Sequence, residues 1–262
     1  MKSLRQIPAT VYLIFIYGFI LLPVIILVLF SFQASRVPVP PFNGPSLQWY
    51  GEIFRDRNLM EALGNSVFVA VVSSSIAVVL GFLGAYALAR YHLPPKDFWR
   101  WLLMAPLSVS YLIIAIGLLI TYNMLGVPKS LLAIIIGHVV INLPLCFSII
   151  YSQMGDNQAN LEKAARDLGA REWQVLTLIS VPLLLPAIFA SFFLSVTLSW
   201  DEFLIAQLVS LFDVTLPVEI WSLLKSGLNP KTNAVGSFVF MVSVAVVLIA
   251  EVLIFGRRKN RV

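Results

Sequence analysis

Residues that build catalytic and metal centres are scarce in this chain of 262 residues. It has one cysteine, Cys146, and two histidines, His92 and His138, on separate segments. A lone cysteine excludes an intramolecular disulfide, and neither a His-Glu-x-x-His zinc motif nor a Gly-x-Ser-x-Gly nucleophile motif occurs. The Gly-x-x-x-x-Gly-Lys-[Ser/Thr] phosphate loop is missing as well, which removes that route to ATP binding. We therefore expect a chain that is not an enzyme and binds no cofactor or metal itself.

Charged residues are also scarce, at 12% of the chain against 59% hydrophobic residues, which is far from the composition of a soluble domain. A membrane-spanning helix needs about 20 predominantly apolar residues. The segments between the apolar stretches are too short or too polar for a separate soluble domain. The sequence therefore predicts an all-α membrane protein in which residues 1–262 form a single transmembrane domain. Its six predicted spans are residues 8–32, 65–89, 101–124, 130–151, 183–211 and 235–255.

Most of the 18 Lys and Arg residues lie on one side of these predicted spans. Because cytoplasmic loops carry the excess of positive charge, both termini and the connection 152–182 are predicted to be cytoplasmic. Cations at helix ends also account for the net charge of +5 without a nucleic-acid partner. The cations on the predicted cytoplasmic side are Lys2, Arg5, Arg90, Lys96, Arg100, Lys163, Arg166, Arg171, Arg257, Arg258, Lys259 and Arg261.

A charged segment, residues 161–186, interrupts the apolar sequence. Leu161, Ala164, Ala165 and Leu168 fall at i, i+3, i+4 and i+7, which predicts one apolar face of a short helix. Gly169 follows at the position of a C-capping glycine. A helix of about two turns is not stable alone in water, so this one is expected to dock into a groove of a partner.

This segment resembles the EAA loop of bacterial ABC-importer permeases, through Ala164-Ala165-x-x-Leu168-Gly169-Ala170 followed by Ile179-x-Val181-Pro182. The resemblance implies a cytoplasmic coupling helix that docks on a separate ATPase subunit, which binds the ATP and Mg. The family's glutamate, six residues before the glycine, is Lys163 here, and Glu162 comes one position earlier, so either could make the ATPase contact. The implied coupling residues are Glu162, Lys163, Ala164, Ala165, Asp167, Gly169, Ile179 and Pro182.

Two adjacent carboxylates, Asp201 and Glu202, fall inside the fifth predicted span. A charge at membrane depth costs roughly 2.5–3.5 kcal/mol and marks a functional site by default. One interpretation is that at least one of them lines a water-filled pathway and attracts a cationic solute. The alternative is that the helix breaks near Trp200, so that both acids lie at a wet surface or pair with a neighbouring subunit.

The run from Leu194 to Glu202, with Ser199 and Trp200 before the acids, resembles the fifth span of spermidine/putrescine permeases, the second of their two permease subunits. The resemblance covers nearly the whole chain and implies type I ABC-importer permease architecture in the bacterial cytoplasmic (inner) membrane. It also implies a substrate path containing Ser199, Trp200, Asp201 and Glu202. The implied partners are ABC ATPase subunits, a second related permease, an extracytoplasmic solute-binding protein and membrane lipid, without nucleic acid.

Two other functions fit the same composition. The chain could be an ABC permease for another small solute, because nothing in the sequence separates spermidine from putrescine or from other cations. It could also be a self-contained secondary transporter that uses Asp201 or Glu202 as an ion site. Secondary transporters usually show two related halves, and no convincing internal repeat is visible here.

Overall fold

The computed structural model describes residues 2–37, 40–227 and 229–259, and within them all regular secondary structure is helical. Side chains near the two ends, at positions 2–10 and 253–259, fall outside this description, as does that of residue 250. The chain divides into two compact units, which are described separately: Met1–Glu61 with Glu219–Ser243, and Ala62–Val218 with Val244–Val262.

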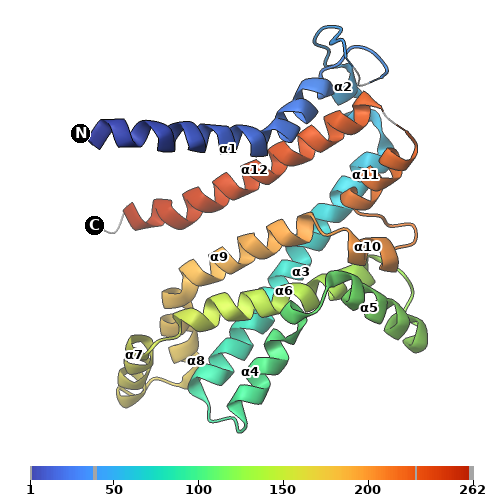
Figure 1. Cartoon of the computed structure of the whole chain (residues 1–262). Helices are drawn as coiled ribbons and strands as arrows, with labels where there is room; N and C mark the ends of the chain where they lie inside the picture. Colours follow the sequence, from blue (N-terminus) through green and yellow to red (C-terminus); the bar gives the residue numbers. More distant parts are fainter. Residues whose placement is uncertain (1, 38–39, 228, 260–262) are drawn as a thin grey trace. The chain divides into compact units, whose positions relative to one another are not determined.

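The first unit contains α1, α2, most of α11 and the first half of α12 (Figure 1). The hydroxyl of Tyr50 on α2 lies 2.8 Å from Ser31 Oγ on α1 and 3.2 Å from Ser237 Oγ on α12. Asp56 and Lys231 form an ion pair of 2.5 Å, and this hydrogen bond holds the pKa of the Asp56 carboxyl below its usual value. These polar contacts fasten the short α2 to the two long helices. The bounds are α1 Lys2–Ser31, α2 Gln48–Arg55, α11 Leu216–Lys225 and α12 Pro230–Lys259.

The second unit is a helical bundle in which α6 and α9 pack side by side (Figure 1). Ser130 caps the start of α6 by accepting a hydrogen bond from the Ala133 backbone NH, and Gly126 ends α5 in the left-handed conformation, with φ of 68°. Its elements are α3 Arg57–Arg90, α4 Lys96–Met104, η1 Ala105–Ser108, α5 Tyr111–Leu125, α6 Leu131–Gln153, α7 Asp156–Asp167, α8 Glu172–Val175, η2 Leu176–Ser180, α9 Val181–Trp200 and α10 Leu204–Val209.

Close approach of α3 and α6 depends on Gly81. A Cβ atom added at Gly81 would lie 2.8 Å from the Phe147 backbone nitrogen and 2.9 Å from Cys146 Cβ, closer than real Cβ contacts allow. Cys146 and Phe147 are themselves buried, within a core cluster that contains residues of α3, α6 and α9. The absence of a side chain at Gly81 therefore lets two long helices pack at their backbones.

Among the residues that the structure describes, five helices are long and apolar enough to cross a membrane, and a bent pair raises the number to six. The third predicted span, 101–124, is this pair: α4 with η1 meets α5 at a bend of 104°. The bend arises because Pro106 lies in a short 3-10 turn and Val109 leaves the helical conformation.

The fifth predicted span, 183–211, differs in its limits from the helix in the structure. The helical path starts at Glu172, passes through a π-helical turn at 176–180, and ends at Trp200. The segment predicted as a loop, 152–182, consequently contains α7 and the start of this spanning helix, residues 172–182. The prediction of orientation used terminal cations whose side chains lie outside the described part of the chain, namely Lys2, Arg5, Arg257, Arg258, Lys259 and Arg261.

Candidate functional site

The helix α7 has well-defined ends. Asp156 places a negative charge in its first turn, where the helix dipole favours one. At the other end Gly169 adopts φ of 89°; its NH bonds to the Arg166 carbonyl (2.9 Å), and the Ala170 NH bonds to the Ala165 carbonyl (3.0 Å). This pair of bonds is the Schellman motif, so the prediction that Gly169 ends the helix is confirmed.

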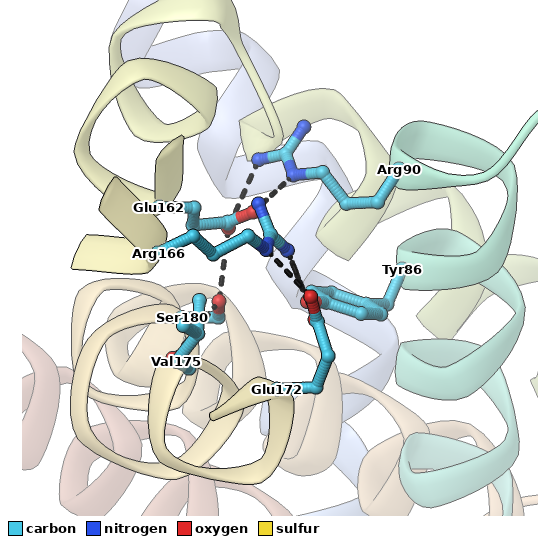
Figure 2. Close-up of polar contacts among 7 residues, drawn as sticks. All are labelled: Tyr86, Arg90, Glu162, Arg166, Glu172, Val175 and Ser180. Atoms are coloured by element: carbon cyan, nitrogen blue, oxygen red, sulfur yellow. Dashed lines mark hydrogen bonds and ion pairs between the residues drawn. The ribbon is translucent and has the colours of Figure 1, made fainter. Parts of the chain in front are cut away.

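The inward face of α7 is held by a buried ion pair. Glu162 is 0% exposed, and its carboxylate accepts hydrogen bonds from Arg90 at the end of α3, with Nε–Oε2 at 2.5 Å and Nη2–Oε1 at 3.2 Å. Ser180 Oγ donates a third bond to Glu162 Oε1, at 2.9 Å. Figure 2 shows these three side chains converging from three different elements. Glu162 therefore connects α7 to α3 and to the start of the spanning helix that contains α9.

A second ion pair lies beside the first (Figure 2). Arg166 on α7 donates two hydrogen bonds to Glu172 on α8, at 2.7 and 3.1 Å, and this contact raises the pKa of the guanidinium above its usual value. The same guanidinium donates a bond of 3.4 Å to the Tyr86 hydroxyl on α3. The pair is partly exposed and so is worth little in stability. Arg166 nevertheless connects α7 to α3 and to the start of the spanning helix, as Glu162 does one turn earlier.

The opposite face of α7 is open. Leu161 is 53% exposed and Leu168 is 90% exposed, while Lys163, Ala164 and Asp167 are exposed as well. Of the predicted coupling residues, Glu162 is thus buried, Lys163 is exposed, and Ala165 is half-buried. Ile179 and Pro182 do not belong to α7: Ile179 lies in the π-helical turn and the exposed Pro182 begins α9.

The acids of the fifth span lie just after α9 ends, which agrees with the predicted break near Trp200. Asp201 is exposed, but Glu202 is buried. The Glu202 carboxylate accepts hydrogen bonds from the backbone NH of Ile205, at 3.0 Å to each oxygen, and of Ala206, at 3.3 Å. Glu202 thus satisfies the free NH groups at the start of α10, where the helix dipole favours a negative charge.

Glu202 also joins a polar chain that connects α3, α6 and α9. His138 Nε2 lies 3.3 Å from Glu202 Oε2, His138 Nδ1 lies 2.6 Å from Ser199 Oγ, and Ser199 lies 3.1 Å from Ser73 Oγ. The sequence did not predict this chain of contacts, because nothing in residue spacing relates positions so far apart in the chain. Of the four predicted path residues, Ser199, Trp200 and Glu202 are buried, and Asp201 alone is exposed.

Across the described ranges no group of three or more His, Cys, Asp or Glu side chains could hold a metal ion. Apolar helices that can span a bilayer, with one of them interrupted next to an exposed carboxylate, are features of membrane permeases. The chain belongs to the family described as "binding-protein-dependent transport system inner membrane component", whose model matches residues 57–259. It is a multi-pass inner-membrane protein and a permease subunit of an ABC importer.

Two curated relatives from Escherichia coli strain K12 extend this comparison over almost the full chain. The spermidine/putrescine transport system permease protein PotC is 30% identical over 247 residues, covering 94% of this chain and 93% of PotC. The putrescine transport system permease protein PotI is 31% identical over 254 residues, covering 94% of this chain and 90% of PotI.

Solved structures agree on the fold. A chain of a bacterial alginate ABC transporter, in complex with an alginate-bound periplasmic protein, superposes with a TM-score of 0.74 at 18% identity, covering 95% of this chain and 93% of that one. A chain of the MetNI methionine ABC transporter gives a TM-score of 0.59 at 14% identity, covering 77% of this chain and 98% of the MetNI chain. At these identities the likeness concerns the fold, which is that of type I ABC-importer permeases.

Proposed function

We propose that this chain forms half of the translocation path of an ATP-driven polyamine importer. The observation that carries the proposal is the similarity, over 94% of the chain, to permease proteins named for spermidine and putrescine transport. Asp201 supports it, because an exposed carboxylate at a break in a span can attract a cationic amine.

In this proposal the chain is non-catalytic and works with other subunits. Its termini and α7 face the cytoplasm, where separate ATPase subunits bind ATP and Mg and dock on the exposed face of α7. A second, related permease completes the path, and an extracytoplasmic binding protein delivers the solute. The alginate structure supports the last partner, since that transporter was solved with its periplasmic protein.

The ion pairs of α7 provide the mechanical connection. A force applied to the outer face of α7 passes through Glu162 to Arg90 on α3 and to Ser180 on the spanning helix. ATP can shift the permease between two states only if the ATPase contacts differ between them. A helix that is bonded to the permease at one face and exposed at the other is suited to transmit a change in ATPase contacts to the spanning helices.

Within the path, the four predicted residues divide by role. Asp201 meets the solute, whereas Glu202 and Ser199 form the buried contacts that fix the end of α9 and the start of α10. Trp200 is buried, so it offers no open ring face to a cation.

The test is uptake of labelled spermidine and putrescine by cells that lack this chain and are complemented with variants. Asp201→Asn is expected to lower uptake by about tenfold while insertion and ATPase binding persist, because one charge-assisted contact is lost. The matched control Asp213→Asn changes another exposed acid of the same charge and should leave uptake unchanged.

If the wild-type complex binds its ATPase but transports no polyamine, the chain is still a permease subunit, but polyamines are not its substrate. The relevant alternative is an importer of another small solute, since structural neighbours with the same fold are named for alginate and methionine. Family membership decides against a self-contained secondary transporter.

A further inference from the structure

The exposed face of α7 is a defined surface with its own chemistry. Its residues recur at i, i+3, i+4, i+7 and i+8, so they form one stripe along the helix. Leu168 projects from the end of the stripe, 90% exposed, which leaves a large apolar side chain without cover. This surface, called the docking stripe below, consists of Asn160, Lys163, Ala164, Asp167 and Leu168.

The order of two adjacent residues decides which charge the docking stripe presents. Successive helical positions point about 100° apart, so Glu162 and Lys163 cannot share a face. Glu162 is fully buried and its two oxygens already accept three hydrogen bonds. The acid is therefore committed to the interior of the chain, and the cation faces outward.

Lys163 stands without an ion-pair partner in the part of the chain that the structure describes. Asp167, one turn later on the same stripe, forms no ion pair with it either. A lysine placed before an acid is the weaker orientation for an i, i+4 pair on a helix, so this arrangement leaves the ammonium open to a partner. The stripe thus offers a positive charge at its middle and an apolar side chain at its end.

We propose that the docking stripe fits a groove of the ATPase subunit that places a carboxylate opposite Lys163 and an apolar hollow opposite Leu168. The inference rests on the proposed function, in which α7 docks on an ATPase, and adds the chemistry of the partner. An anionic lipid surface is a poorer fit, because Asp167 shares the stripe and would face the same negative charges. Charge complementarity of this kind sets partner choice and orientation.

The experiment is co-purification of the assembled importer, with both permeases and the ATPase, in lipid nanodiscs. ATPase retention is measured for wild type, Lys163→Glu and Lys163→Met across a range of salt concentrations. Lys163→Glu is expected to weaken ATPase binding by about tenfold or more and Lys163→Met by less, because reversal adds repulsion to the lost attraction. Reversing one carboxylate in the ATPase groove should restore binding to Lys163→Glu and not to wild type.

The matched control is Lys96→Glu, which makes the same charge change at an exposed lysine on α4. Equal retention by Lys163→Glu and Lys96→Glu would overturn the inference and leave the proposed function intact. Tighter binding of Lys163→Glu would also overturn it, since the partner would then present a cation. If the wild-type importer never retains an ATPase, the result contradicts the proposed function itself.

Discussion

At the scale of single residues, the Arg90–Glu162 ion pair is expected to be costly to break. Arg90 is nearly buried and Glu162 completely so. Removing one partner of a buried pair leaves the other charge desolvated, which costs about 3–5 kcal/mol, whereas replacing both by apolar residues is often neutral. We therefore expect Glu162→Leu alone to destabilise the protein strongly, and the addition of Arg90→Met to recover most of the loss.

Thermal unfolding in detergent measures this prediction as a double-mutant cycle. Each single variant should lower the unfolding midpoint. The fall in the midpoint of the double variant should be far smaller than the sum of the two single falls. Arg166→Met serves as the comparison, because its pair with Glu172 is partly exposed and should cost only about 0–1 kcal/mol. Additive losses at Arg90 and Glu162 would contradict the role assigned to the pair.

At the scale of helices, the packing of α3 against α6 makes Gly81 a sensitive position. A methyl group at Gly81 meets the Phe147 backbone, which cannot rotate away as a side chain could. Gly81→Ala is thus expected to cost about 1–3 kcal/mol through overpacking. Gly64→Ala, in the same helix with nothing within 4 Å of the added atom, should instead be neutral or stabilising by up to about 1 kcal/mol. Unfolding midpoints in detergent distinguish the two, and equal midpoints would mean that α3 and α6 are not closely packed.

Helices are also the scale at which sequence reasoning was most informative. Apolar length located the spanning helices, and the glycine after an amphipathic run located the end of α7 at Gly169, because both signals are local. The break after Trp200 was predicted as one of two alternatives, whereas the size of the bend between η1 and α5, 104°, was not predicted. Glu202 meets the freed backbone at α10 through the NH of Ile205, but its burial depends on His138 of α6, which is distant in sequence.

The same limit applies to the charges. Adjacent Glu162 and Lys163 were equal candidates for a partner contact until the position of Arg90 was known, since a salt bridge across 72 residues leaves no spacing signal. The paired acids Asp201 and Glu202 likewise looked equivalent. Burial of Glu202 separates them, and burial is a property of the packed helices.

At the scale of the whole molecule, the proposed function requires that α7 respond to the ATPase without losing its connection to the spanning helices. Gly169 sets the direction of the chain between α7 and α8, at φ of 89°, where a β-branched residue is strained. Gly169→Val should cost roughly 1–2 kcal/mol at this turn and misdirect α7 relative to α8. In the assembled importer we expect insertion to persist while ATP hydrolysis no longer drives uptake.

Parallel assays of ATP hydrolysis and labelled-solute uptake in proteoliposomes measure this uncoupling. Gly155→Ala is the matched control, because Gly155 lies at the other end of α7 with an ordinary negative φ and open space around it. Since Gly169, unlike Gly155, is in the left-handed conformation, a loss of coupling confined to its variant would connect transport to the geometry of this turn. Normal uptake by Gly169→Val would mean that the orientation of α7 relative to α8 is not what transmits ATP binding to the permease.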